Sequence, residues 1–119
     1  MLDARALDVY LGLTAPAKMV PLHGWGHISG AKLFSAKLIA NRLGPATFYT
    51  PDMIEAAAKA LKVDPHEASI TYCNSGVLGS VTWFALSELL ENRAVRLFDG
   101  SMHQWSRTIP DAIVRFVME

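Results

Sequence analysis

The stretch Ser-Ile-Thr-Tyr-Cys-Asn-Ser-Gly-Val-Leu-Gly at residues 69–79 decides the fold and contains the chemistry. Its first part, Ser69–Cys73, is rich in β-branched and aromatic side chains, which predicts a buried strand. The small residues of Asn74–Gly79 predict a loop, and apolar side chains at helical spacing predict a helix over Ser80–Glu91. The single cysteine of the chain, Cys73, therefore lies where a strand ends and a loop leads into a helix.

Strands and helices alternate on both sides of this stretch. The sequence predicts further strands over Met1–Arg5, Ala31–Phe34 and Ala94–Phe98. It predicts helices over Ala6–Leu13, Ser35–Leu43, Thr50–Leu61 and Met102–Arg107, with Thr50 as the N-terminal cap of the third. Thr14–Gly30 is rich in glycine and proline and is predicted as a loop, and Ile113–Val117 can be either a helix or a strand. Such alternation gives an α/β fold, a mainly parallel sheet with helices on both faces. Sites in these sheets lie at the carboxyl ends of strands, which is the position of Cys73.

The composition predicts one globular domain over residues 1–119 and excludes several classes of protein. Apolar residues make up 51% of the chain and charged residues 18%, so the chain is not disordered. A formal net charge of zero argues against nucleic-acid binding, which needs a basic surface. No apolar run reaches the ~18 residues of a membrane-spanning helix, so we expect no membrane partner.

The N-terminus and the cysteine and histidine positions restrict the compartment and the metal chemistry. Asp3 stands where a secretory signal peptide carries basic residues, so we expect a cytoplasmic protein, with the periplasm left open. One cysteine rules out an internal disulfide and a zinc site built on paired cysteines. His23 and His27 are four residues apart in a loop with no third ligand, so we expect no bound metal.

The position of Cys73 suits sulfur chemistry. A loop of small residues between a strand and a helix can direct several backbone N–H groups inward, and the helix adds its positive end. Both would stabilise a thiolate at Cys73 and hold an incoming anion or the terminal sulfur of a persulfide. The alternative is a small buried hydrophobic residue at a strand end, which is a common role of free cysteine. The spacing alone leaves both interpretations open.

Four segments form an ordered set of motifs from residue 2 to about residue 107. They are an Asp-x-Arg strand end in Leu2–Arg5, a Gly-His-Ile-Ser-Gly-Ala motif in Gly26–Ala31, the strand and loop of Ile70–Val77, and a terminal signature in Val95–Trp105. This set resembles the rhodanese-like sulfurtransferases, the group of the thiosulfate and mercaptopyruvate sulfurtransferases, in which proline usually stands at the position of Ser29.

The resemblance implies a sulfurtransferase that works by covalent catalysis without a cofactor. A donor such as thiosulfate would give its outer sulfur to Cys73, and the persulfide would pass it to cyanide, a thiol or a sulfur-carrier protein with ping-pong kinetics. By the same resemblance, Cys73 is the nucleophile. The sulfur-binding N–H groups would come from Asn74, Ser75, Gly76, Val77 and Leu78, and structural roles near the site would fall to Asp3, Arg5 and His27.

Leu78 departs from the family pattern, in which Arg, Thr or Ser is common at this position. Leucine offers a donor anion neither charge nor hydroxyl, and residues 74–80 contain no Lys or Arg. Low thiosulfate activity or a different donor is one expectation. The second hypothesis is a rhodanese-like binding or regulatory module with little or no catalysis, and the third is a persulfide sensor. Gly79 stands where cysteine phosphatases carry arginine, which argues against phosphoryl transfer.

The resemblance also bears on domain organisation. The family's first strand and helix, which usually precede the Asp-x-Arg strand, have no counterpart in this sequence. We expect either the C-terminal half of a two-domain protein or a shortened single domain. An open sheet edge would leave unpaired backbone groups, and a partner domain or a second copy in a homodimer would cover the surplus of apolar residues.

Overall fold

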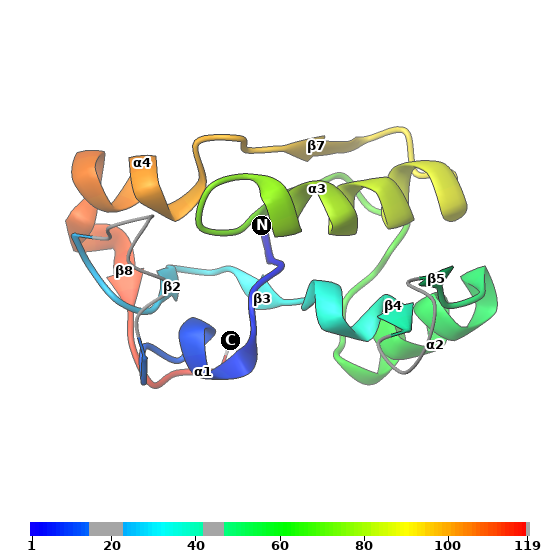
Figure 1. Cartoon of the computed structure of the whole chain (residues 1–119), viewed down its shortest axis with the longest axis horizontal. Helices are drawn as coiled ribbons and strands as arrows, with labels where there is room; N and C mark the ends of the chain where they lie inside the picture. Colours follow the sequence, from blue (N-terminus) through cyan, green and yellow to red (C-terminus); the bar gives the residue numbers. More distant parts are fainter. Residues whose placement is uncertain (15–22, 42–46, 119) are drawn as a thin grey trace.

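In the residues that the structure describes, the main sheet has four parallel strands. Figure 1 shows how the other elements are arranged around it. The computed structural model describes residues 1–14, 23–41 and 47–118. The strands are β1 (Leu2–Asp3), β3 (Lys32–Leu33), β6 (Ser69–Tyr72) and β7 (Val95–Leu97), in the order β3-β1-β6-β7. The N-terminal strand β1 lies between two others, with Leu2 opposite both Lys32 and Thr71. The predicted α/β class with a mainly parallel sheet is confirmed.

Helices, short turns and two small antiparallel strand pairs complete the described residues. The helices are α1 (Leu7–Tyr10), α2 (Pro51–Ala60), α3 (Val77–Phe84) and α4 (Ser101–Thr108). The turns are the 3₁₀ turns η1 (Ala36–Leu38) and η3 (Pro110–Ala112) and the π-helical turn η2 (Ala85–Leu89), which continues α3. The strand pairs are β2 (His27–Ile28) with β8 (Ile113–Val114) and β4 (Ala40–Asn41) with β5 (Thr47–Phe48). None of the helices in these residues is long and apolar enough to cross a bilayer.

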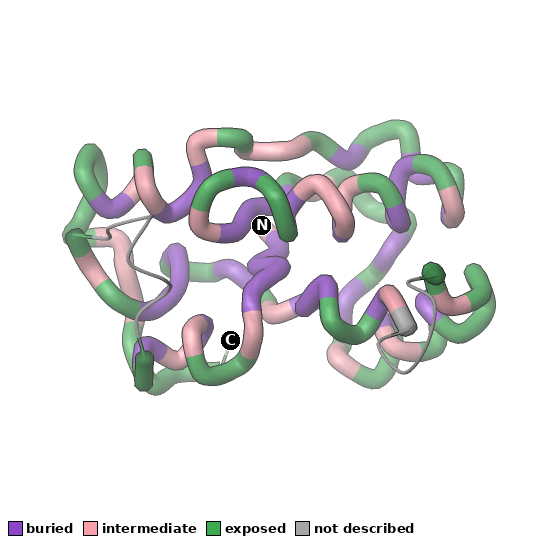
Figure 2. Tube along the Cα trace, in the orientation of Figure 1, coloured by how far each residue is buried: buried purple, intermediate pink, exposed green. Residues whose placement is uncertain are grey.

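Helices pack on both faces of the main sheet, and each face has its own apolar core. On one face α2, α3 and η2 pack over Leu2 and Val95. On the other face α4 and β2 pack over Tyr72. Figure 2 shows that the buried chain around the N-terminal strand lies in the middle of the molecule. Because side chains alternate along a strand, neighbouring residues such as Thr71 and Tyr72 serve different faces.

Gly79 allows α3 to lie close to β6. A Cβ atom at this position would lie 3.2 Å from the Cα of Tyr72 and 3.0 Å from the Cδ1 of Leu97. The hydroxyl of Thr71 also donates a hydrogen bond of 2.9 Å to the carbonyl oxygen of Gly79. This close packing fixes the first turn of α3 beside the carboxyl end of β6, where Cys73 follows.

One part of the second sheet face is open. Met1, Ile70, Arg96, Phe98 and Trp105 are among the residues that line a pocket of about 400 Å³. Ile70 projects from the sheet into this region and is 39% exposed. The pocket adjoins β7, which is the last strand of the four-stranded order on that side among the described residues.

Local sequence signals placed some elements correctly. Thr50 caps α2 as predicted, because its Oγ accepts a hydrogen bond of 3.3 Å from the Met53 N–H. The apolar segment at 113–117, for which the sequence allows either a helix or a strand, contributes the short strand β8. The helical turn predicted over Met102–Arg107 is longer and begins at Ser101 as α4.

The helix predicted over Ser35–Leu43 is wrong. The chain makes one 3₁₀ turn over Ala36–Leu38 and then enters β4. The apolar residues of this segment have helical spacing, but the segment instead pairs with a later part of the chain. Ala40 lies opposite Phe48 in the antiparallel strand β5. The loop predicted over Thr14–Gly30 contains β2 at its described end, while residues 15–22 and 42–46 lie outside the described residues.

We expect Leu86→Ala to lower the free energy of unfolding by about 2–5 kcal/mol, because it opens a cavity in a packed core. Leu86 is fully buried with the α2 and α3 side chains, whereas Leu7 in α1 is 48% exposed. The matched change Leu7→Ala should stay within about 0.5 kcal/mol of the natural chain. Urea unfolding of the two variants measures the difference, and equal losses would contradict this description of the core.

Candidate active site

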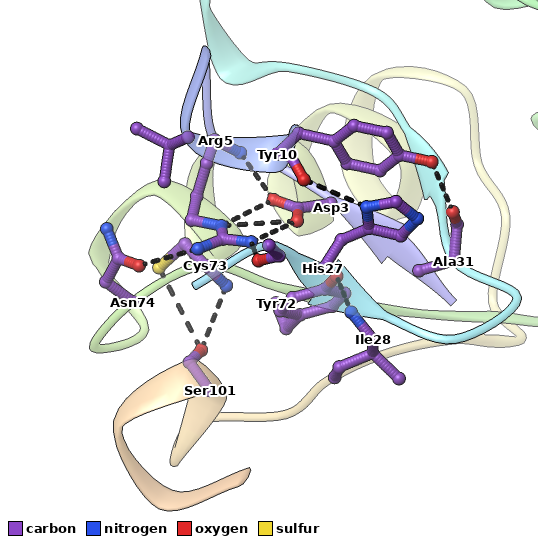
Figure 3. Close-up of polar contacts among 12 residues, drawn as sticks. Asp3, Arg5, Tyr10, His27, Ile28, Ala31, Tyr72, Cys73, Asn74 and Ser101 are labelled. Carbon is purple, nitrogen blue, oxygen red and sulfur yellow. Dashed lines mark hydrogen bonds and ion pairs between the residues drawn. The ribbon is translucent and has the colours of Figure 1, made fainter. Parts of the chain in front are cut away.

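Cys73 follows β6 and lies buried at the base of a tight loop. Its side chain is 2% exposed, and the backbone N–H of Gly76 donates to its Sγ at 3.0 Å. Figure 3 shows Cys73 between Asn74 and Ser101. The loop is short because α3 begins at Val77. The sulfur therefore lies at the N-terminal end of a helix, where the helix dipole favours a negative charge.

Gly76 makes the sharp turn between Cys73 and α3. It is the N-cap of α3 and has a left-handed backbone with φ of 99°. A Cβ atom there would lie 2.6 Å from Oδ1 of Asp99 and 3.0 Å from its carbonyl oxygen. Both the positive φ and the missing space require glycine at this position.

This turn corrects two sequence-based expectations. The small-residue pattern predicts a loop that reaches Gly79 and a helix that begins at Ser80, yet Val77 and Leu78 already form the first turn of α3. A left-handed Gly76 reverses the chain at once, so no longer loop is needed. Ser80 therefore lies inside the helix, where its hydroxyl donates to the carbonyl oxygen of Val77.

The first turn of α3 supplies backbone N–H groups at the site. The N–H of Ser80 donates to the carbonyl oxygen of Gly76 at 2.9 Å and closes the first helical turn. The N–H groups of Val77, Leu78 and Gly79 precede this bond and therefore have no acceptor within the helix. Together with the N–H of Gly76, they form a cluster of donors suited to an anion.

Ser101 holds the cysteine from the opposite side. Its Oγ accepts a hydrogen bond of 3.0 Å from the Cys73 N–H, donates one of 2.8 Å to the carbonyl oxygen of Phe98, and lies 3.9 Å from the Cys73 Sγ. The following N–H groups of α4, from Met102 and His103, donate to the carbonyl oxygens of Cys73 and Asn74 at 2.9 and 3.0 Å. The start of α4 thus fixes the backbone of the cysteine loop.

Sequence reasoning placed no role on Ser101 or Asp99. Ser101 is fully buried and has a left-handed backbone, with φ of 51°. The sequence feature that could have identified Ser101 is the Asp-Gly-Ser segment directly after a predicted strand. A polar segment at the carboxyl end of a parallel strand lies beside the site in such sheets. Asp99 approaches Gly76 and brings a carboxylate to the edge of the loop.

Asp3 and Arg5 form a buried ion pair that reaches the cysteine loop. The guanidinium donates to both carboxylate oxygens of Asp3, with the shortest contact at 2.7 Å. It also donates to the carbonyl oxygen of Gly26 at 2.6 Å and to Oδ1 of Asn74 at 3.1 Å. Burial opposes the charge, but the hydrogen bonds and charge of Asp3 outweigh it and raise the pKa of Arg5 above its ordinary value. Arg5 thus remains a cation that joins three segments of the chain.

His27 anchors its own segment and lies apart from the sulfur. Its ring stacks on Tyr10 with centroids 3.7 Å apart, and its Nδ1 is 2.9 Å from the Tyr10 carbonyl oxygen. The Tyr10 hydroxyl donates in turn to the carbonyl oxygen of Ala31 at 2.7 Å. Figure 3 shows this stack on the other side of Asp3 from Cys73. Of the predicted residues, Gly76 donates directly to the Cys73 Sγ, and Asp3 and Arg5 reach the cysteine loop through Asn74.

The mouth of the site is apolar and carries little positive charge. Val77 and Leu78 are exposed at the start of α3, and Ser75 is exposed beside them. Residues 74–80 contain no Lys or Arg, and a carboxylate, that of Asp99, lies beside the loop. In the described part of the chain, no group of three His, Cys, Asp or Glu side chains is arranged to hold a metal ion.

Tyr72 directly precedes Cys73 and contacts both Ile28 and Arg5. Its hydroxyl accepts a hydrogen bond of 3.1 Å from the Ile28 N–H, and the Arg5 guanidinium lies 5.8 Å from its ring centroid. Burial raises the pKa of Tyr72 well above its ordinary value, and the charge of Asp3 raises it further, while Arg5 acts in the opposite direction. The phenol therefore stays neutral in the folded protein.

Comparison with known proteins places this fold and site in a family. The model of the rhodanese-like domain matches residues 1–108. The chain therefore belongs to the family of rhodanese-like domains.

Three relatives illustrate the similarity. The chain is 31% identical over 111 residues to a Haloferax volcanii protein named "Putative thiosulfate sulfurtransferase", covering 92% of this chain and 38% of that protein. It is 30% identical over 112 residues to a Mycobacterium leprae protein, SseA, of the same printed name, covering 92% and 36%. The crystal structure of the Tum1 protein from Saccharomyces cerevisiae matches with a TM-score of 0.76 and 27% identity, covering 97% and 39%. The chain spans about two fifths of the length of these proteins.

We expect Tyr72→Phe to lower the free energy of unfolding by about 1–3 kcal/mol at pH 7, because the buried Ile28 N–H loses its acceptor. The difference should shrink above pH 10. An unfolded tyrosine ionises near pH 10 and the folded Tyr72 does not, so the stability of the natural chain falls as pH rises through this range. Urea unfolding at pH 7 and pH 11 gives both values, and a constant difference would contradict the assigned pKa direction.

Proposed function

We propose that this chain is a sulfurtransferase that carries sulfane sulfur on Cys73. The observation that carries the proposal is the position of the Cys73 Sγ, which accepts the Gly76 N–H at 3.0 Å at the N-terminal end of α3. The chain belongs to the family of rhodanese-like domains. Two proteins similar to it carry the name "Putative thiosulfate sulfurtransferase". No cofactor takes part in the proposed reaction.

The first half-reaction forms a persulfide. The Cys73 thiolate attacks the outer sulfur of thiosulfate, a new S–S bond forms, the old S–S bond breaks, and its electron pair leaves with sulfite. In the second half-reaction a cyanide ion or a thiolate, from a small molecule or a sulfur-carrier protein, attacks the outer sulfur and restores the Cys73 thiolate. The two steps share one enzyme-bound intermediate, which gives ping-pong kinetics.

The chain's own groups hold the sulfur and its charge. The N–H of Gly76 donates to the Sγ, and those of Val77 and Leu78 follow it in the first turn of α3. Together they would stabilise the terminal sulfur of the persulfide. Arg5 acts at a distance, because it positions Asn74 and thereby the loop. Ser101 fixes the Cys73 backbone from the α4 side.

A second candidate function is a rhodanese-like module that binds a partner with little or no turnover. The apolar Leu78 and the lack of Lys and Arg over residues 74–80 favour this alternative, because a thiosulfate dianion would depend on backbone N–H groups alone. The buried, hydrogen-bonded Cys73 favours the transferase.

Intact mass spectrometry tests the proposal directly. Incubation with thiosulfate should add one sulfur, about 32 Da, and cyanide should remove it under the covalent scheme. Cys73→Ser should stay folded, with an unchanged thermal melting temperature, and should never gain the sulfur. Sulfur transfer by the folded Cys73→Ser variant would refute the role of Cys73. Absence of the added mass with both thiosulfate and mercaptopyruvate would favour the binding module.

We expect Leu78→Arg to raise kcat/KM for thiosulfate by about tenfold at low ionic strength, because a cation at the loop attracts the dianion. The gain should fall as salt is added. Leu78→Met is the matched control, since it preserves the apolar character and should leave thiosulfate turnover near its natural value. An equal effect of the two substitutions would show that charge at this position does not limit the reaction.

A further inference from the structure

The outer side of α3 carries a hollow whose lining includes Leu78, in the first turn of the helix. It lies between α3 and η1–β4, is lined by Ala36, Lys37, Ala40, Leu78 and Val81, and encloses about 260 Å³. We call it the α3 groove. Leu78 belongs both to this lining and to the first turn of α3, whose N-terminal end lies at the Cys73 Sγ. The groove lining thus includes a residue two positions after Gly76, the residue whose N–H donates to the Cys73 Sγ.

The hollow continues along the helix beyond Val81. A second depression of about 370 Å³ is lined by Phe48, Ser80, Val81, Trp83 and Phe84, and it shares Val81 with the groove. The rings of Phe48 and Phe84 stack with centroids 5.3 Å apart, although each side chain is 40% exposed. Both depressions are lined by residues of α3, from Leu78 to Phe84. Figure 1 shows α3 running from the loop end toward the side of the molecule that holds β4 and β5.

This side of α3 is apolar without being covered by the described residues. The inner side of the helix, at Gly79 and Thr82, is buried against the sheet. The outer side exposes 69% of Val77 and 37% of Leu78 at the entrance to the site. Apolar side chains that face water around a reactive sulfur are suited to an apolar ligand, because contact with it removes their surface from water.

Lys37 is the one charged residue among those that line the two depressions. Its side chain is exposed on η1 and contributes to the lining of the groove. Among the described residues, no carboxylate forms an ion pair with it. A ligand with an apolar body in the groove could therefore place one anionic group beside this ammonium.

We propose that the α3 groove binds the apolar body of an organic sulfane-sulfur donor that carries an anionic group toward Lys37. This inference rests on the proposed function and names its substrate class. The thiolate of Cys73 attacks the outer sulfur of the donor and forms a new S–S bond. The bond between that sulfur and the rest of the donor breaks, and its electron pair leaves with the organic fragment. For a thiosulfonate donor, this fragment is the sulfinate, and no further oxidant or reductant is needed.

Three thiosulfonates separate the parts of the proposal. Methanethiosulfonate presents the reactive sulfur without an apolar ring, benzenethiosulfonate adds the ring, and 4-carboxybenzenethiosulfonate adds the anionic group. The readout is kcat/KM for sulfur transfer to cyanide. The ratio of the benzene to the methane donor, compared between the natural chain and each variant, cancels the different reactivity of the two leaving groups.

Polar substitutions in the groove should lower this ratio. We expect a fall of about fivefold for Leu78→Asn, which preserves side-chain size, and of about twofold for the near-isosteric Val81→Thr, because a polar side chain must be desolvated when the ring binds against it. Met53→Gln is the control, because Met53 is an exposed apolar residue of α2 outside the groove, and it should leave the ratio unchanged. An unchanged ratio in both groove variants would overturn the proposal.

The charge is tested separately. Lys37→Met should lower kcat/KM for 4-carboxybenzenethiosulfonate by about two- to fivefold and leave benzenethiosulfonate unchanged, as expected for an exposed ion pair. Lys59→Met, on the exposed side of α2, should change neither. An equal effect of Lys37→Met on the two donors would overturn the assignment of Lys37.

The outcomes distinguish the two levels of inference. A Cys73 persulfide that forms with thiosulfate and with all three thiosulfonates, with no effect of the groove variants, would reject the groove and leave the sulfurtransferase standing. Failure of every donor to form a persulfide on the folded chain would reject the sulfurtransferase and the groove proposal together.

Discussion

The site depends on the ion pair and hydrogen bonds that the Arg5 guanidinium makes. The guanidinium joins β1 to two distant segments, through Asp3, the Gly26 carbonyl oxygen and Asn74. Both charges are almost completely buried, so each needs the other and the surrounding acceptors to offset the loss of water. A lysine could not replace this group, because one ammonium cannot direct planar N–H donors to three separate acceptors. Breaking such a pair generally costs about 3–5 kcal/mol.

The cysteine loop is held from two directions, and each uses a left-handed residue. On the β6 side, Gly76 turns the chain so that its own N–H reaches the sulfur and α3 begins at the next residue. On the α4 side, Ser101 adopts a positive φ and accepts the N–H of Cys73. The loop therefore provides fixed backbone donors without a cationic side chain. This explains how one location can suit a sulfur anion and still present an apolar surface at Leu78.

Much of the site followed from local signals in the sequence. The β-branched run before Cys73 and the small residues after it placed the cysteine at the end of a parallel strand, and the structure has it there. The family resemblance gave Asp3 and Arg5 structural roles near the site, and the two residues form a buried ion pair. These features depend on residues close together in the chain, where pattern and propensity carry the information.

The missed features depend on contacts between distant residues. The helix expected over Ser35–Leu43 gave way to pairing of Ala40 with Phe48, which no local pattern reports. The early start of α3 required a left-handed Gly76 packed beside Asp99, 23 residues later in the sequence. The stack of His27 on Tyr10 joins residues 17 positions apart, a contact that no local pattern reports.

The bonds from α4 to the cysteine loop also give a way to observe the loop from outside it. The amide protons of Met102 and His103 are donated to the carbonyl oxygens of Cys73 and Asn74. They can exchange with solvent deuterium only when these bonds open, so their exchange rates report local opening of the loop. The motion of a buried nucleophile can thus be followed at two amides that take no part in its chemistry.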